Sequence, residues 1–293
     1  TQREGGVAHA LRLLREVGHA PDLGVDAGRL REFVDQVSRL YRPNPYHSWN
    51  HAVDVTHFLA WMLLRPQFQA SLPAGDPFWM LLAALCHDVD HPGHDNQWEI
   101  ATHSPLAARY SNEAVLEHHS VDVTLELLGR ETCAFHRTMA PALQQRGPQL
   151  LRELILATDF SIHKPFVTRL AAALDAGPVK ISPERPEFLL LVEQALVKAA
   201  DIANTTRPFT VAKVWAQRVM EEIWAQGRKQ REAGMPVPTL NDEQRTTLKQ
   251  AQLGFLRNLA GDLFVELARV EPELQTLVQG IQANVQAYEA LPG

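Results

Sequence analysis

Hydrophobic residues recur at spacings of three and four along most of this chain, with Ala, Leu, Glu, Gln and Arg between them. This period is typical of amphipathic α-helices. It predicts helices over residues 150–158, 188–200, 211–226 and 248–268. No sustained run alternates with a period of two, so the sequence predicts no sheet. The expected fold class is all-α, a compact arrangement of many helices.

Clusters of proline and glycine predict the breaks between helices. Residues 71–77 are expected to end one helix and start another, with Asp76 as N-cap and Pro77 at the first helical position. Residues 139–147 are expected to form an exposed connection. The sequence has no internal repeat, and 293 residues can bury a large core. We therefore expect one domain over residues 1–293, with a helical N-terminal part over 1–40.

Composition excludes several classes of protein. The net charge of −6 disfavours a nucleic-acid polymer as partner. No apolar run approaches the roughly 18–20 residues of a membrane span, and the first thirty residues lack a signal-peptide core. Only two cysteines are present, which favours a reducing compartment, and we expect a soluble cytoplasmic domain whose parent protein could be membrane-associated. Because the sequence begins at Thr1, we expect a longer parent chain that could carry regulatory domains.

Two histidine pairs carry the strongest chemical signal. His87 is followed directly by Asp88 and, four residues on, by His91. Upstream, His47 and His51 are also four residues apart. This spacing puts both members of a pair on one helix face, and imidazole nitrogen with carboxylate oxygen suits zinc and harder cations. The two pairs together predict a site for divalent metal ions.

A further ligand is expected from another helix. Asp201 is a lone acid at the end of an apolar predicted helix, where burying an unpaired charge would be costly. The alternative, an N-cap or surface acid, stays open on sequence alone. With His51, His87 and Asp88, it would hold a first ion in a site with open positions. Asp88 could bridge to a second ion.

Five motifs occur in a characteristic order. They are Tyr-His-x-x-x-His-Ala-x-Asp-Val at 46–55, His-Asp-x-x-His-Pro-Gly at 87–93, Thr-Asp-x-x-x-His at 158–163, Ala-Asp-Ile-x-Asn at 200–204 and Gln-x-Gly-Phe at 252–255. Over about residues 40–290 the chain thus resembles the catalytic domain of class I 3′,5′-cyclic-nucleotide phosphodiesterases, in the HD superfamily. The resemblance implies a compact all-α catalytic domain of that superfamily.

The same resemblance implies two metal ions. A tightly held ion, zinc, would be bound by His51, His87, Asp88 and Asp201. Asp88 would also reach a second, loosely held magnesium or manganese ion, whose waters would contact His91, Glu117 and Thr158. A hydroxide between the ions would attack phosphorus. His47 would be the general acid that protonates O3′, and Glu222 would orient it.

The substrate implied by the resemblance is cAMP, cGMP or both, hydrolysed to the 5′-monophosphate. The residues implied to bind it are Tyr46, Asn204, Trp215, Val219, Gln252 and Phe255. Without the motif, core packing would explain Phe255 and Val219, and Gln252 could be a surface amide. The Gln252 amide can present either face, so nucleotide preference stays open. The sequences of residues 154–159 and 252–255 weakly favour a relative that prefers cGMP.

The chain departs from the family pattern at several positions. Ser120 stands where the family has a second histidine, Phe160 where it has methionine, and Thr205 where it often has proline. None of these changes removes a proposed catalytic group, although Phe160 is expected to narrow the mouth of the pocket.

Three residues within or next to the motifs are candidates for supporting roles. Asp54 could orient a ligand histidine. Lys198 and Arg207 could be salt partners near Asp201.

Two other functions remain as alternatives. One is an HD-type phosphohydrolase acting on other phosphate esters, which would not require His47, Gln252 and Phe255 in these contexts. The other is a non-catalytic nucleotide sensor, which is disfavoured because every proposed ligand is present. Replacing Asp201 by Ala would separate an enzyme, which loses turnover, from a sensor, which keeps binding nucleotide.

Overall fold

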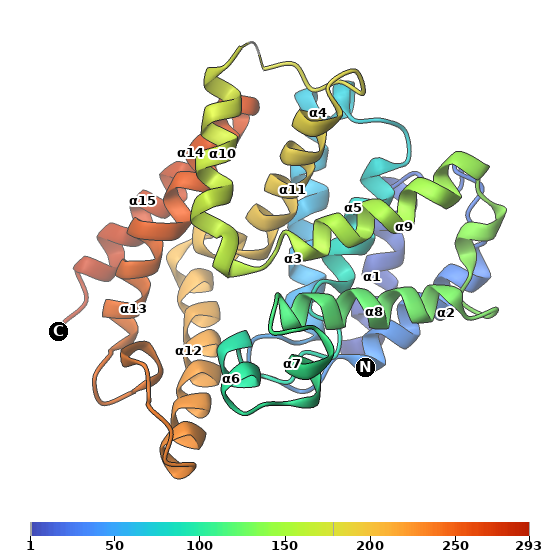
Figure 1. Ribbon diagram of the computed structural model, residues 1–293. Helices are drawn as coiled ribbons and strands as arrows, with labels where there is room; N and C mark the ends of the chain where they lie inside the picture. Colours follow the sequence, from blue (N-terminus) through green and yellow to red (C-terminus); the bar gives the residue numbers. More distant parts are fainter. Residues whose placement is uncertain (1, 178, 293) are drawn as a thin grey trace.

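The computed structural model describes residues 2–177 and 179–292, and every regular element in those ranges is helical (Figure 1). The first nine helices are α1 (Gln2–Glu16), α2 (Ala27–Leu40), α3 (Trp49–Leu63), α4 (Pro66–Ser71), α5 (Asp76–Cys86), α6 (Asn96–Ala101), α7 (Pro105–Arg109), α8 (Val115–Gly129) and α9 (Pro141–Leu156). The remaining helices are α10 (His163–Asp175), α11 (Pro186–Asp201), α12 (Phe209–Glu232), α13 (Leu248–Phe255), α14 (Gly261–Val270) and α15 (Gln275–Glu289). The prediction of an all-α fold is confirmed.

Short helical turns connect several of these helices. Two of them adjoin the motifs: η2 (Phe160–Ile162) follows the Thr-Asp pair, and η3 (Ala203–Thr206) follows α11. A π-helical turn, η5 (Leu256–Ala260), joins α13 to α14. The predicted helix over 248–268 is therefore one continuous helical run that widens once in the middle.

Helix α5 lies at the centre of the fold. All of its residues except Pro77 are buried, and it packs against α3, α9 and α11 (Figure 1). A helix that is apolar on every face can only be stable inside a protein. Because α5 ends at Cys86, the His87-Asp88 pair that follows it emerges in the interior rather than on the surface.

Helices α3 and α11 bring the other candidate ligands to the same region. From Phe188 to Ala200 nearly all of α11 is buried, and it packs against both α3 and α5. Asp201 is its last residue, and His51 lies in the first turn of α3. The apolar faces of three helices therefore decide where the polar residues at their ends meet.

Three expectations about local structure are wrong. Neither histidine pair lies on one helix face, because α5 ends at Cys86, before His87, and α3 begins at Trp49, after His47. The N-cap of α5 is Gly75, with φ of +95°, which glycine adopts without a steric penalty. Asp76 is instead the first residue of the helix, and its buried carboxylate accepts hydrogen bonds of 2.6 and 3.0 Å from Arg146.

The segment 139–147 is mostly helical rather than an exposed connection, because α9 begins at Pro141. Gly147 is buried against Trp79, and an added Cβ would lie 1.9 Å from Cε2 of that ring. The missing side chain lets α9 approach α5 closely. Glycine here therefore marks helix packing, and not a turn.

One cluster of buried apolar side chains includes residues from Val7 to Tyr288. Within the described residues, no helix combines the length and the hydropathy that crossing a membrane requires.

Candidate metal centre and active site

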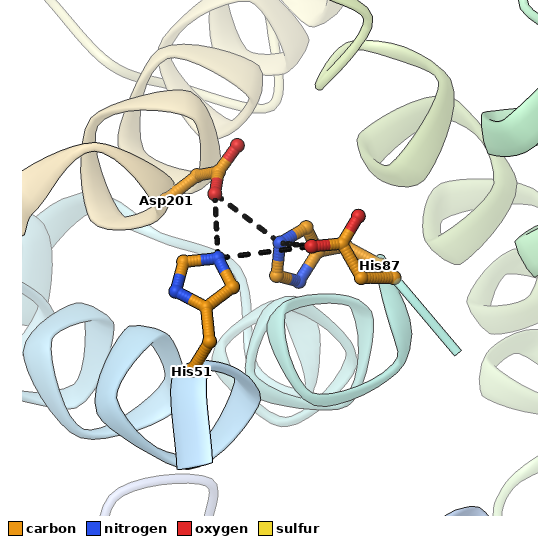
Figure 2. Close-up of side chains that lie close together, drawn as sticks. His51, His87 and Asp201 are labelled. Carbon is orange, nitrogen blue, oxygen red and sulfur yellow. Dashed lines mark hydrogen bonds and ion pairs between the residues drawn. The ribbon is translucent and has the colours of Figure 1, made fainter. Parts of the chain in front are cut away.

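Four of the predicted ligands converge on one point. His51, His87, Asp88 and Asp201 each offer one ligand atom, and these atoms all lie within 4.8 Å of one another. Figure 2 shows the side chains of His51, His87 and Asp201 pointing toward one another from three different helical segments. The residues come from positions up to 150 apart in the chain. The predicted convergence of these side chains is therefore present.

The distances inside this cluster are short. Oδ1 of Asp201 lies 3.0 Å from Nε2 of His51 and 3.2 Å from Nε2 of His87. Oδ2 of Asp88 lies 3.0 Å from Nε2 of His87 and 3.7 Å from Nε2 of His51. Both imidazoles are about 1% exposed. Two nitrogens and two carboxylate oxygens thus enclose a small buried space.

The chemistry of these donors fits a divalent cation. Nδ1–H of His87 donates to the carbonyl oxygen of Ala84 (2.9 Å), so Nε2 presents its lone pair to the cluster. Oδ2 of Asp88 is buried and has no hydrogen bond of acceptable geometry within the described chain. A buried carboxylate oxygen that has ion-pair contacts with two imidazoles but no hydrogen bond is well suited to coordinate an ion. The nearby histidines hold the pKa of Asp88 and Asp201 well below the usual range despite burial, so both remain anionic.

A second group of donors lines a pocket beside the first. The pocket has a volume of about 400 Å³, and its wall includes His91, Glu117 and Thr158, the residues predicted near a second ion. His47, Asp88 and His91 also offer ligand atoms within 4.8 Å of one another. Asp88 belongs to both groups. Among the described residues, Asp88 is therefore the carboxylate that the two ligand groups share, while Asp201 of the first group also lines the pocket.

The side chains of this second group are held in defined orientations. Nδ1 of His91 accepts from the backbone N–H of Gly93 (3.0 Å), and burial together with His47 lowers the pKa of His91 to about 3. Glu117 accepts from Nδ2 of Asn96 (3.0 Å), and burial raises the pKa of Glu117 to about 7. Thr158 donates its hydroxyl to Ile155 O (2.7 Å), which leaves the oxygen lone pairs able to accept.

His47 and Glu222 form an ion pair at the edge of the same pocket. Nδ1 of His47 donates to Oε1 of Glu222 in a short contact, and the backbone N–H groups of Tyr46 and His47 donate to Oε2 at 3.0 and 3.1 Å. Burial alone would lower the pKa of His47, but the carboxylates of Asp88 and Glu222 raise it to about 9. His47 correspondingly lowers the pKa of Glu222 to about 2, against the effect of burial. The predicted pairing of these two residues is present, across 175 positions.

Three of the predicted substrate-binding residues lie together. Nδ2 of Asn204 donates to the hydroxyl of Tyr46 (2.8 Å), and both residues are buried. The Tyr46 ring lies 4.4 Å from the His51 ring and 5.8 Å from the Trp215 ring, measured between centroids. These three residues therefore pack together, and the rings of Tyr46 and Trp215 lie beside the ligand His51.

The other three predicted substrate-binding residues lie on two helices, α12 and α13. Val219 is on α12 and Gln252 and Phe255 are on α13, two helices that pack against each other. None of the six predicted substrate-binding residues is among the described residues that line the 400 Å³ pocket. Phe160 does line it, and its ring lies 5.6 Å from that of Phe255. Phe160 thus connects the pocket to α13.

Two expected supporting contacts are different in the structure. Asp54 pairs with Arg207 (3.1 Å), so neither residue serves Asp201 or a ligand histidine in the expected way. Lys198 is buried and donates to two backbone carbonyl groups instead of to a carboxylate. Asp159 and Asn96 also line the pocket and were missed. Asp159 could have been found, because it belongs to the Thr-Asp motif.

A larger hollow, of about 730 Å³, lies between α9, α10 and α11. It contains no residue of the two ligand groups. The smaller pocket is therefore the candidate active site, because it brings together histidines and acids with shifted pKa values beside the ligand groups.

Comparison with known sequences agrees with this site. The model of the 3'5'-cyclic nucleotide phosphodiesterase family matches residues 46–281. The probable 3',5'-cyclic-AMP phosphodiesterase pde-4 of Caenorhabditis elegans is 28% identical over 283 residues, covering 95% of this chain and 42% of that protein. The high affinity cGMP-specific 3',5'-cyclic phosphodiesterase 9A of Mus musculus is 28% identical over 280 residues, covering 95% and 52%. The chain thus spans about half the length of these relatives.

Solved structures are similar over nearly the whole chain. The phosphodiesterase domain of the RhoPDE fusion protein from the choanoflagellate Salpingoeca rosetta superposes with a TM-score of 0.91 at 27% identity, covering 98% of this chain and 90% of that one. The structure of LmjPDEB1 in complex with IBMX gives 0.92 at 27% identity, covering 98% and 86%. The family match includes the five motifs and the convergent ligands. The chain belongs to the 3'5'-cyclic nucleotide phosphodiesterase family.

Proposed function

We propose that this chain hydrolyses 3′,5′-cyclic nucleotides, cAMP, cGMP or both, to 5′-nucleoside monophosphates. The observation that carries this proposal is the group of four ligand atoms within 4.8 Å of one another, beside a pocket that also contains His47 and Glu222. Relatives named for cAMP and for cGMP match the chain about equally well. Their names therefore support the substrate class and leave the preference between the two nucleotides open.

The proposed metals are zinc at the four-ligand group and magnesium or manganese beside it. The zinc ligands would be His51, His87, Asp88 and Asp201, and the residues around the second ion would be Asp88, His91, Glu117 and Thr158. Nitrogen and carboxylate donors together suit zinc, whereas oxygen donors and water suit magnesium and manganese. When bound, such ions supply Lewis-acid stabilisation of phosphoryl oxygens and a more acidic water.

His47 is the proposed general acid for the departing O3′. Its Nδ1–H is engaged by Glu222, so Nε2 is the atom that would carry the proton to the leaving group. Glu222 also accepts from two backbone N–H groups, which limits its own movement. The role of Glu222 is thus to hold the imidazole in one orientation and to stabilise its cationic form.

The proposed substrate-binding residues are Tyr46, Asn204, Trp215, Val219, Gln252 and Phe255. Tyr46, Asn204 and Trp215 pack together beside the ligand His51, so they would lie near the ribose and phosphate end of a bound nucleotide. Gln252 is buried, and a buried amide has a strong need for a hydrogen-bond partner, which a purine edge would supply.

We further propose that residues 1–293 act as a single catalytic domain, with the motifs over about 40–290 and helical N-terminal residues 1–40. The core that includes residues from Val7 to Tyr288 supports this. A cytoplasmic location is proposed from the composition, and any regulatory domains would belong to a longer parent chain.

Hydrolysis of cAMP and cGMP in parallel, at low substrate with magnesium or manganese, tests the proposal. Metal-dependent release of 5′-AMP or 5′-GMP, abolished by a chelator, is expected. Asp201→Ala should lose both bound zinc and turnover, whereas Asp262→Ala, an exposed acid on α14, should keep both. Zinc-loaded wild-type protein that hydrolyses neither nucleotide would contradict the proposal. Nucleotide binding by that protein would indicate a sensor, and its absence would favour another phosphate ester.

A further inference from the structure

The segment 157–159 forms part of the wall of the pocket, where Thr158 and Asp159 line it. It leaves α9 directly after Leu156 and leads into η2. The last carbonyl groups of a helix have no partner within the helix. Such carbonyl groups need an external donor when they are buried, and the donor decides where the departing chain lies.

Lys198 supplies that donor from the neighbouring helix α11. Its Nζ donates to the carbonyl oxygens of Ala157 (2.6 Å) and Asp159 (3.2 Å). One turn earlier on the same helix, Nε2 of Gln194 donates to the carbonyl oxygen of Glu153 (3.3 Å). Two side chains of α11 therefore bind the C-terminal end of α9, where a cation is also favoured by the helix dipole. Figure 1 shows α9 ending beside α11.

Burying the Lys198 ammonium group at this position is energetically unfavourable. Its side chain is only 3% exposed and lies over the Phe166 ring, 5.5 Å from the centroid. Burial lowers the pKa of Lys198 to about 8, opposed by the carboxylates of Asp201, Asp159 and Glu117. An apolar residue would avoid the cost of burying an ammonium group. An apolar side chain, however, could not donate the two hydrogen bonds to the carbonyl groups of Ala157 and Asp159.

Lys198 also lies on the helix that carries a metal ligand. Asp201 follows it by three residues, at the end of α11. A hydrogen bond from Lys198 to the segment 157–159 therefore links the wall of the pocket to the same rigid helix as Asp201. Thr158 and Asp159 cannot move away from the ligand group without breaking that link.

We propose that Lys198 is a positioning residue for the second divalent ion, holding segment 157–159 against α11 so that its oxygen atoms face the ion. The inference rests on the proposed function for the presence of that ion. It adds a residue that touches neither the ion nor the nucleotide and acts only through two backbone carbonyl groups.

The direction in which the affinity for Mn²⁺ changes when Lys198 is replaced separates this positioning role from a simple effect of charge. Removing a cation near three carboxylates would, by electrostatics alone, make the pocket bind a divalent cation more tightly. Releasing the segment 157–159 would make it bind more weakly, because Thr158 would lose its place. Loss of groups that orient a metal site typically weakens metal binding by about 10- to 100-fold. We therefore expect Lys198→Met to bind Mn²⁺ at least about tenfold more weakly.

The experiment is a titration of zinc-loaded protein with Mn²⁺, followed by the electron paramagnetic resonance signal of free Mn²⁺. Lys198→Arg keeps a cation with several donors and should lose less affinity than Lys198→Met. Lys164→Met, at an exposed lysine on α10, should bind Mn²⁺ as the wild type does. Unchanged or tighter binding by Lys198→Met would overturn the inference. If that variant does not fold, Lys198→Gln takes its place, with the same weaker binding expected and the same contrary result.

Hydrolysis of cAMP and cGMP by the wild type is measured on the same preparations. Wild-type protein that binds Mn²⁺ but hydrolyses neither nucleotide would reject the proposed function, and the titration would still test Lys198. Active wild-type protein together with unchanged Mn²⁺ affinity in Lys198→Met would reject the role of Lys198 alone. At saturating Mn²⁺ the activity of Lys198→Met should recover, which a general loss of folded protein would not produce.

Discussion

Replacing Gly280 by alanine tests how α15 supports the site. Gly280 faces η3, and an added Cβ would lie 2.2 Å from the carbonyl oxygen of Thr206. One turn later, Nδ2 of Asn284 donates to the carbonyl oxygens of Thr205 (2.7 Å) and Arg207 (2.9 Å). Helix α15 thus holds the backbone of η3, the turn that carries Asn204. A side chain at 280 would push this backbone away.

Two opposing effects determine the size of the change. Alanine is better than glycine inside a helix by about 1 kcal/mol. The overlap with Thr206 requires a backbone shift of roughly 1 Å, and overpacking of this kind costs about 1–3 kcal/mol. Gly5, in α1, has no atom within 4 Å of an added Cβ, so Gly5→Ala shows the helix preference alone. Gly280→Ala is therefore expected to be about 1–3 kcal/mol less stable than Gly5→Ala.

Urea unfolding followed by circular dichroism, at fixed pH and metal concentration, gives both free energies. In the folded Gly280→Ala protein, the displaced Asn204 should also raise KM for the cyclic nucleotide relative to Gly5→Ala. Equal stabilisation of the two variants would refute the reasoning, because it would mean that η3 yields to the added methyl group without cost.

Three further predictions concern charge and metal. Burial and the neighbouring Asp76 carboxylate raise the pKa of Glu193 to about 9. Folding therefore retains a proton that unfolding releases, and this group should lower stability by about 1 kcal/mol per pH unit between about pH 5 and 9. Urea unfolding should show that slope removed by Glu193→Gln and retained by the exposed control Glu187→Gln; equal slopes would contradict the assignment. Steady-state assays of Glu222→Gln should show kcat lowered about 10- to 100-fold with little change in KM. The variant Glu221→Gln, at an exposed neighbouring residue, should stay active. Full activity of Glu222→Gln would argue against the orienting role. Chelation should lower the melting temperature by several degrees, and added zinc should restore it, because ions that bind only the folded state stabilise it. Scanning fluorimetry measures this temperature, and an unchanged value after chelation would argue against a tight metal site.

Local patterns were sufficient to predict the helices and most candidate ligands. The predicted helices over 188–200 and 211–226 lie within α11 and α12, because their apolar spacing is a property of each segment. His51, His87 and Asp88 were recognisable for the same reason, since their spacing depends only on neighbours in the chain. The Gly75 cap and the helical 141–147 were not predicted, because both depend on what α5 and α9 meet.

The sequence by itself determined which residue types are available for metal chemistry and close to which predicted helices they lie. It could not determine partners that are distant in the chain. The contact of His47 with Glu222, the pair of Asp54 with Arg207 and the carbonyl contacts of Lys198 each join a helix to a non-helical segment far away in the chain. Only tertiary structure decided these, because apolar packing of α3, α5 and α11 sets the distances between helix ends, and buried polar groups then take the nearest partner that satisfies them.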